Sequence, residues 1–377
     1  MCGMFYPQKS LKDHRKNEGI VMDRIFDGTA GRLHISEPEL YIDNQARKRS
    51  GHMSHAMIEY LPGRIIDFNS NCSAVRLRGH AAYGWVEYRY SDDYGKNWSG
   101  PHDLPYSKQV FFDGNYTISV EKGVCCNGVI SLFALRNTQF SPICCEPWKT
   151  AMVLQSYDFG KTWTDPYELC EYEGRVYDAA VHDGVIYVMI FCNPNHVGKN
   201  RNHVYRLYSS RDNGKSFQLV NVIDIKHIGH AYGALRFRDD GSLIAYANNM
   251  GNGFLLSESI SFDLGKTWKR LPDAKLPEGI RNIQVSRLGP GYVMHGRAFR
   301  NAPWGKGLIV YTSKDAVKWD DGILLEPDKR SCYYSGNLRL VNPDGTETLL
   351  VQYSDVYGDT PANSDAVNVM HMFLHFE

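Results

Sequence analysis

The sequence lacks the long apolar segments and the charge excess that mark several classes of protein. It has no run of about 18 apolar residues, so no membrane-spanning helix is expected. Its 42 basic and 42 acidic side chains cancel, and a chain without net charge has no broad field to draw it to nucleic acid or to a membrane surface. The N-terminal segment MCGMFYPQKSLKDHRKNEG has no apolar signal core, which predicts a cytoplasmic protein.

Motifs for cofactors and metals are also missing. The sequence has no P-loop, no G-x-G-x-x-G after a strand and no H-E-x-x-H, so no cofactor is expected. Its nine cysteines include two adjacent pairs and no C-x-x-C, which favours reduced cysteines that pack in a core over disulfides or a zinc site. The 43% of hydrophobic residues is ample for such a core.

A turn motif is repeated along the chain. The pattern S-x-D-x-G-x-[TSN]-[WF] begins at Ser91, Ser156, Ser210 and Ser261, a shortened copy (SKDAVKW) begins at Ser313, and successive starts are 51–65 residues apart. An Asp carboxylate can accept hydrogen bonds from the backbone of its own turn, and Gly supplies a positive φ. The pattern therefore predicts a tight hairpin with an aromatic ring packed under it, which is a structural feature rather than a catalytic one.

A second repeat precedes each copy of this motif. Six stretches, of which YDAAVHDGVIYVMIF is an example, read as strand, Gly-containing turn and strand with alternating apolar residues. With the hairpin that follows, each unit supplies four strands, and four-stranded repeats of about 40–60 residues are propeller blades. The sequence therefore predicts an all-β, six-bladed β-propeller.

The sixth unit has no hairpin motif and needs a strand from elsewhere. The segment GRLHISEPELYID (Gly31–Asp43) is the obvious donor, because pairing the two ends of the chain closes the ring and removes two open sheet edges. We expect one propeller domain over residues 26–377, preceded by an N-terminal arm over residues 1–25.

The five hairpin motifs, known as Asp-boxes, on a six-bladed propeller resemble those of the sialidase (neuraminidase) superfamily. The resemblance covers nearly the whole chain from Gly31. It implies a site on the face opposite the boxes, near the axis, built from the starts of the inner strands and the loops between the second and third strands.

The sharpest local match is CYYSGNL. Sialidases carry their nucleophilic tyrosine in a Tyr-Ser stretch at the start of the last inner strand, and Tyr334 with Ser335 is similar to it. A phenol suits an anomeric carbon that bears a carboxylate, since a carboxylate nucleophile would be repelled. The phenol needs a nearby base because its unperturbed pKa is near 10.

Several sialidase positions differ in this chain. The Arg-Ile-Pro stretch of the first blade corresponds to SHAM around His55, residues 69–84 contain no carboxylate, and no Glu lies near Tyr232 to activate the tyrosine. We therefore predict Tyr334, Asp178, Asp113 and His55 as the catalytic group, in which Asp113, Asp178 or a histidine is the acid/base.

The remaining predicted site residues are substrate-binding. Arg binds a carboxylate through two parallel hydrogen bonds, Asn and His form hydrogen bonds with hydroxyl groups, and Tyr stacks on sugar faces. The convergence of these residue types on one face therefore suits an acidic sugar. The set comprises Arg76, Arg78, His80, Arg136, His230, Tyr232, Asn248, Arg297 and Arg300.

Three functions remain open at this stage, all with carbohydrate as the partner. The first is a sialidase-like exo-glycosidase that retains configuration through Tyr334. The second is a uronate-specific lyase, in which Arg neutralises the carboxylate while Tyr334 and a histidine move protons. The third is a glycan-binding propeller without catalysis. The sequence indicates neither the sugar nor the oligomeric state.

Overall fold

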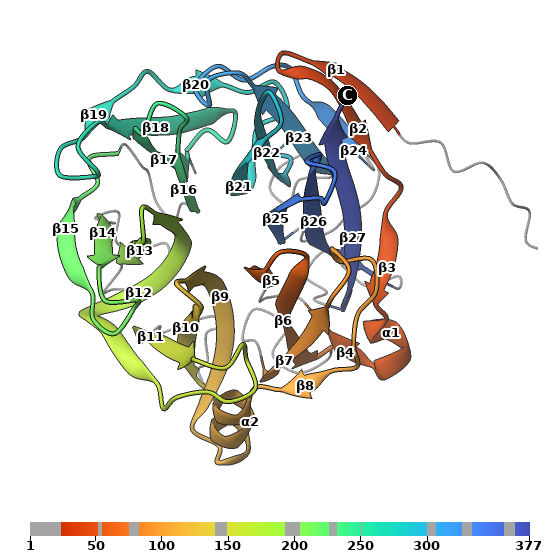
Figure 1. The fold of residues 1–377 in the computed structure, drawn as a ribbon, viewed down its shortest axis with the longest axis vertical. Coiled ribbons are helices and arrows are strands. Elements are labelled where there is room, and N and C mark those ends of the chain that lie inside the picture. Colours follow the sequence, from red (N-terminus) through yellow and green to blue (C-terminus); the bar gives the residue numbers. More distant parts are fainter. Residues whose placement is uncertain are drawn as a thin grey trace, which may run out of the picture.

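The computed structural model describes residues 24–51, 55–74, 83–139, 149–192, 204–225, 232–249, 251–299, 307–325, 334–357 and 366–377. These residues form six antiparallel blades around a central axis (Figure 1). Each inner strand lies against the next one, and the sixth lies against the first, so the ring is closed. The predicted six-bladed propeller is confirmed.

Blades 1 to 3 follow one another along the chain. Blade 1 contains β4 (Arg49–Ser50), β5 (His55–Leu61), β6 (Arg64–Ser73), β7 (Gly84–Ser91) and β8 (His102–Asp103). Blade 2 contains β9 (Tyr116–Cys126), β10 (Val129–Thr138), β11 (Thr150–Ser156) and the first part of β12 (Tyr167–His182). Blade 3 contains the rest of β12, β13 (Val185–Cys192), β14 (Val204–Ser210) and β15 (Gln218–Val222). The long strand β12 thus joins blades 2 and 3 into one sheet.

Blades 4 to 6 complete the ring. Blade 4 contains β16 (Gly233–Phe237), β17 (Leu243–Asn248), β18 (Leu255–Ser261), β19 (Lys269–Arg270) and β20 (Ala274–Lys275). Blade 5 contains β21 (Arg281–Leu288), β22 (Gly291–Arg297), β23 (Leu308–Ser313) and β24 (Ile323–Leu325). Blade 6 contains β25 (Ser335–Val341), β26 (Glu347–Val356) and β27 (Val367–Phe376), with β1 (Arg24–Gly28), β2 (Gly31–Ile35) and β3 (Glu39–Ile42) from the other end of the chain.

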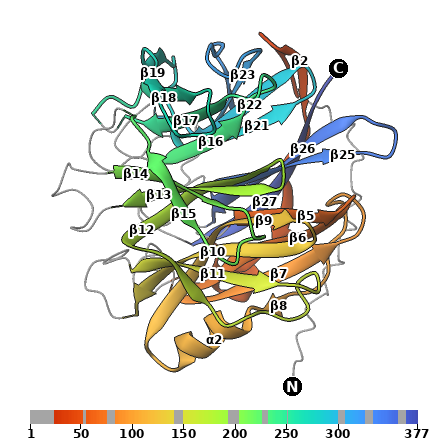
Figure 2. The same cartoon turned by 60° about the vertical axis from the view of Figure 1, so that its left-hand side comes forward.

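Pairing of the two chain ends closes blade 6 as predicted. β2 and β3 both pair with β27, and β1 pairs with β2; Figures 1 and 2 show β2 beside the C-terminal end of β27. Two short helices, α1 (Asn44–Arg47) and α2 (Pro105–Phe112), lie outside the sheets. Neither they nor any other described segment is a helix long and apolar enough to cross a membrane. Residues 1–23 of the predicted arm lie outside the described residues, and Arg24 and Ile25 begin β1.

The hydrophobic core lies between the blades. Six clusters of buried apolar side chains fill the six interfaces between neighbouring blades. Central strands such as β13 are buried along their whole length because both of their faces are covered. The apolar runs that predicted the second strand of each unit therefore reflect burial on two sides.

The repeated motif forms the predicted turn. In the second copy, Ser156 donates to Asp158 Oδ1 at 2.8 Å, Gly160 N–H donates to Ser156 Oγ at 2.7 Å, and Thr162 N–H donates to Asp158 Oδ1 at 2.9 Å. Gly160 has φ 87° and Phe159 before it has φ 60°, so two successive residues are left-handed. The same hydrogen bonds recur in the copies that begin at Ser91, Ser210 and Ser261. These turns follow the third strand of blades 1 to 4, at the end of the ring opposite the starts of the inner strands.

A buried carboxyl group lies where blade 6 meets blade 1. Asp67 on β6 is fully buried, and its Oδ2 accepts hydrogen bonds from Gln352 of β26 at 2.7 Å and from Asn69 at 2.5 Å. Burial raises the pKa of Asp67 to about 6. The closure of the ring therefore contains a group that the fold prefers to keep protonated.

We expect the Asp67→Asn substitution to reduce the pH dependence of stability. The folded-state pKa lies above the ordinary value of 3.8, so protonation of Asp67 stabilises the fold below about pH 4 and this stabilisation is lost as the pH rises through 6. A shift of about two units corresponds to about 3 kcal/mol. Urea unfolding at pH 4 and pH 8 should show that the variant loses about 3 kcal/mol less than the parent over this interval. Equal losses would contradict this assignment.

Candidate active site

A small cavity lies on the axis at the starts of the inner strands. Five of the six inner strands or the residues just before them line it, and its volume is about 60 Å³. The lining residues are Glu121, Lys122, Arg175, Tyr177, Tyr232, Gly233, Asn282, Ile283, Gln284, Tyr334 and Ser335. This is the face on which the sequence analysis predicted the site.

Two tyrosines form a hydrogen-bonded pair in this cavity. The phenol oxygens of Tyr232 and Tyr334 are 2.8 Å apart. Each backbone is held by a polar side chain of the adjacent strand, since Tyr334 N–H donates to Ser354 Oγ at 3.1 Å and Tyr232 N–H donates to Asn248 Oδ1 at 2.7 Å. The two phenols therefore project from well-fixed strand starts of blades 6 and 4.

The surroundings of the pair shift the pKa of Tyr334 in two opposite directions. Burial raises the pKa of Tyr334 well above its usual range, and the neighbouring Tyr232 adds to this rise. The positive charges of Arg175 and Arg297 lower the pKa of the same phenol. An ionised Tyr334 would thus be stabilised by guanidinium groups rather than by contact with water.

Arg175 is held by a buried carboxylate. Its Nε and Nη2 donate to Glu121 Oε2 at 2.9 and 2.8 Å, and both side chains are less than one tenth exposed. Although burial opposes it, the Glu121 charge raises the pKa of Arg175. The Arg175 guanidinium lies over the rings of Tyr177 and Tyr232, 5.5 and 5.9 Å from their centroids, a geometry that fixes the charge beside the phenols.

Two further arginines lie directly opposite each other beside the tyrosines. Arg281 on β21 pairs in register with Arg297 at the end of β22. Burial and the charge of Arg297 lower the pKa of Arg281. Arg297 is only 7% exposed, and its Nε has no hydrogen-bond partner among the described residues. Like charges directly opposite on neighbouring strands are destabilising, so this arrangement favours a site that receives an anion.

Irregular strand pairing brings several of these side chains to the axis. Glu121, Tyr177 and Asn282 each occupy a β-bulge or register shift in an inner strand. A bulge re-aims the side chains around it, and bulges are frequent next to active sites. Asn282 also has φ 57°, and neither atom of its buried side-chain amide has a hydrogen-bond partner in the described part of the chain.

A neutral histidine supports the strand that follows Tyr334. His295 on β22 is completely buried; its Nδ1 lies 3.2 Å from Ser335 Oγ and its Nε2 lies 2.8 Å from Asn337 Nδ2. Burial, with a smaller effect of Lys122, lowers the pKa of His295 to about 3. The imidazole is therefore uncharged near neutral pH and orients β25 rather than moving protons.

The structure brings four of the predicted site residues together. Tyr334 and Tyr232 form the phenol pair, Arg297 lies close enough to affect the pKa of Tyr334, and Asn248 holds the backbone of Tyr232. Arg175, Glu121 and His295 were not singled out from the sequence, whereas Arg281 and Asn282 begin an inner strand, where the sequence analysis placed the site. The signal that could have revealed these residues is that they are polar residues inside strands. The bulges that direct their side chains to the axis, however, leave no pattern in the sequence.

Three other predicted residues are engaged elsewhere. Asp178 accepts a hydrogen bond from Leu235 N–H at 2.8 Å and lies 3.5 Å from Lys122 Nζ, which ties blade 3 to its neighbours. Arg136 donates to Glu168 at 3.0 Å, on the outer strand of its own blade. Asp113 is exposed and caps α2, which lies at the rim of the ring (Figure 1). None of the three makes a described contact with either phenol.

The remaining predicted residues cannot be placed in the same way. Arg76, Arg78, His80, His230 and Arg300 lie outside the described residues. For His55 the description covers the backbone, which begins β5. Within the described ranges, no group of three His, Cys, Asp or Glu side chains is arranged to hold a metal ion.

Comparisons with solved structures show a sialidase-like propeller fold. A protein of unknown function from Dyadobacter fermentans DSM 18053 superposes with a TM-score of 0.71 at 15% identity, over 92% of this chain and 99% of that one. The Hadza microbial sialidase Hz136 gives a TM-score of 0.67 at 13% identity, over 89% of this chain and 68% of that one. Trypanosoma rangeli sialidase, solved with the inhibitor DANA, gives 0.60 at 12% identity over 85% of this chain.

The similarity concerns the fold alone. The chain spans about half of the trypanosomal sialidase, 54% of its length. No protein-family model matches the sequence, and no curated protein matches it either. The chemistry must therefore be argued from the site itself.

Proposed function

We propose that the chain is a sialidase-like exo-glycosidase that acts on a terminal acidic sugar, with Tyr334 as its nucleophile. The observation that carries the proposal is the phenol pair, in which Tyr232 and Tyr334 are 2.8 Å apart next to Arg175. The sialidase-like fold supports it, because the pair lies on the propeller face where ligands of such folds bind.

The pair offers a way to activate the nucleophile without a carboxylate. Two phenols at hydrogen-bond distance can release one proton to solvent water and share the other, as coupled acid pairs do. The single negative charge is then stabilised by Arg175 and Arg297, whose charges lower the pKa of Tyr334. Tyr334 Oη attacks the anomeric carbon as the bond to the departing oxygen breaks, and water later hydrolyses the glycosyl–tyrosine bond with retention of configuration. His55 remains the candidate for the acid.

The opposed arginines provide the anion site that an acidic sugar requires. Arg281 and Arg297 face each other across β21 and β22, beside the phenol pair. A sugar carboxylate bound to them would relieve their mutual repulsion and place the anomeric carbon near Tyr334. The cavity volume of about 60 Å³ suits the reacting end of a sugar rather than a whole ring.

Asn282 is expected to bind substrate through its side-chain amide. Buried amides are nearly always hydrogen-bonded, and that of Asn282 has no partner among the described residues. We expect Asn282→Gly, which tolerates the φ of 57°, to raise KM about tenfold, the equivalent of about 1.4 kcal/mol, while Tm stays the same or rises. Initial rates and thermal unfolding test this. A lower Tm with unchanged KM would assign the residue to folding alone.

A uronate lyase is the second candidate function. The observation that favours it is the composition of the site: among the described residues the carboxylate that contacts Arg175 is Glu121, and the two groups of the reactive pair are phenols. In a lyase the arginines would neutralise a uronate carboxylate and an ionised tyrosine would remove the proton next to it.

A panel of glycans distinguishes these functions. The parent, Tyr334→Phe and the exposed control Tyr157→Phe are incubated with aryl sialosides, other aryl glycosides and uronate polysaccharides, and products are identified by mass spectrometry. We expect a released acidic monosaccharide from the parent and the control only. An unsaturated uronate product would establish the lyase. Binding without any product would leave a glycan-binding propeller.

A further inference from the structure

A second and larger cavity, the lower cavity, opens at the end of the axis opposite the cavity of Tyr232 and Tyr334 (the tyrosine cavity). Its volume is about 500 Å³, which lies within the range of small-molecule sites. All six inner strands contribute to its wall, through the residues that follow those of the tyrosine cavity. Lys122 lines both cavities and donates to Gln284 at 2.5 Å, so it stands between them.

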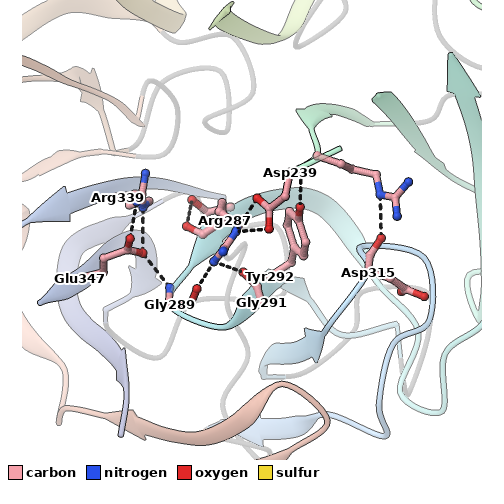
Figure 3. A network of polar contacts seen from close by, with 10 residues as sticks. Asp239, Arg287, Gly289, Gly291, Tyr292, Asp315, Arg339 and Glu347 are labelled. Carbon is pink, nitrogen blue, oxygen red and sulfur yellow. Dashed lines mark hydrogen bonds and ion pairs between the residues drawn. The ribbon is translucent and has the colours of Figure 1, made fainter. Parts of the chain in front are cut away.

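Three arginines from adjacent strands form one wall of this lower cavity. They are Arg236 on β16, Arg287 on β21 and Arg339 on β25. Figure 3 shows that Arg287 and Arg339 are each bound to a carboxylate of a neighbouring turn or strand, Asp239 and Glu347. Neither of these two carboxylates lines the cavity itself.

Arg236 has no such carboxylate. One of its amino groups donates to the carbonyl of Val285, and its Nε is buried without a hydrogen-bond partner in the described part of the chain. It forms no ion pair with any residue described in the structure. Its positive charge at the cavity wall is therefore not neutralised by the described residues, a costly arrangement for a partly buried guanidinium.

The opposite wall does not supply the missing charge. Asp178 lies 3.5 Å from Lys122, so these two groups neutralise each other. The Glu59 carboxylate accepts a hydrogen bond from Gly63 N–H at 2.8 Å; burial raises the pKa of Glu59, and the charge of Arg339, rather than that of Arg236, lowers it. Ser286 and Asn337 add neutral polar groups. The lining contains four basic side chains and two acidic ones, so it is positive as a whole.

We propose that this lower cavity binds a small molecule that carries a phosphate or carboxylate group, with Arg236 as the principal contact. The guanidinium group of Arg236 can form two parallel hydrogen bonds with either oxyanion. Arg287 and Arg339 on the same wall are already oriented by their carboxylate partners. The site is separate from the phenol pair, so the inference does not depend on the proposed glycosidase.

Isothermal titration calorimetry of the full chain tests this proposal. The probes are inorganic phosphate, citrate and, as a neutral comparison, glucose. We expect saturable binding of phosphate or citrate that depends on Arg236 and none of glucose, and the better of the two anions identifies the oxyanion. Arg236→Gln should weaken binding at least about tenfold, whereas Arg270→Gln, an exposed arginine paired with Asp224, should leave it unchanged.

A second variant covers the case in which Arg236→Gln does not fold. Ala180 lines the same cavity, and Ala180→Asp adds a negative charge without removing any contact. It should also weaken anion binding at least about tenfold. The absence of saturable binding to the parent, or equal affinity in the parent and the folded variants, would overturn the proposal.

Discussion

Replacing Tyr334 with phenylalanine is expected to lower kcat/KM by a factor of at least about 1,000, or about 4 kcal/mol of transition-state stabilisation. The ring would keep its packing against Tyr232, with which it forms an edge-on contact at 6.0 Å, so the fold should be preserved. Only the nucleophilic oxygen is lost. The measurement is steady-state kinetics on the sugar that the glycan panel identifies, with thermal unfolding to establish that the variant is folded.

Two matched variants show whether the loss belongs to the nucleophile. Tyr232→Phe removes the hydrogen-bond partner of Tyr334 and should cost about 10 to 100-fold, since it weakens activation but leaves the attacking oxygen. Tyr157→Phe changes an exposed tyrosine on a repeated turn and should have no effect. If Tyr334→Phe retained most of the activity, or if Tyr232→Phe cost more than Tyr334→Phe, Tyr334 would not be the nucleophile.

The Arg175→Met substitution is expected to lower the free energy of unfolding by about 3–5 kcal/mol. The methionine fills much of the space of the arginine stem, but the Glu121 carboxylate is left buried without its partner. The loss should therefore come from an uncompensated charge more than from packing. Urea unfolding near pH 7 measures it.

The double variant Arg175→Met with Glu121→Gln separates these causes. Removing both charges should restore much of the lost stability, since a neutral pair no longer carries the desolvation cost. Arg270→Met, which breaks an exposed ion pair, should cost less than about 1 kcal/mol. If the single and the double variant were equally unstable, the stability would depend on the shape of Arg175 rather than on its charge. Activity should be lost in both variants, because the phenol pair loses its adjacent cation.

The fold could be predicted from the sequence because its information is local and repeated. Each full copy of the turn motif combines a hydroxyl, a carboxylate and a glycine at fixed spacing, and the hydrogen bonds among Ser156, Asp158 and Gly160 show why. The missing strand of the sixth blade followed from counting, since the sixth unit lacks the hairpin that completes the other blades and pairing the two chain ends covers open sheet edges. β2 and β3 supply it.

The site could be predicted only in part because it depends on departures from regular pairing. The repeats align the starts of the inner strands, which was enough to single out Tyr232 and Tyr334. Regular alternation does not show that Glu121 is the extra residue of a bulge, or that Asn282 is left-handed. The assumption of regular alternation also led to the prediction of Asp178 as a catalytic residue, but its carboxylate accepts a hydrogen bond from Leu235 N–H and forms an ion pair with Lys122.

Covalent trapping tests the central claim most directly. The parent is incubated with a fluorinated analogue of its sugar that forms the glycosyl–enzyme but is hydrolysed slowly, and the modified residue is located by peptide mass spectrometry. The account predicts one adduct, on Tyr334, that is absent from the Tyr334→Phe variant. An adduct on another residue, or turnover of the natural sugar with inversion of configuration and no adduct, would contradict it.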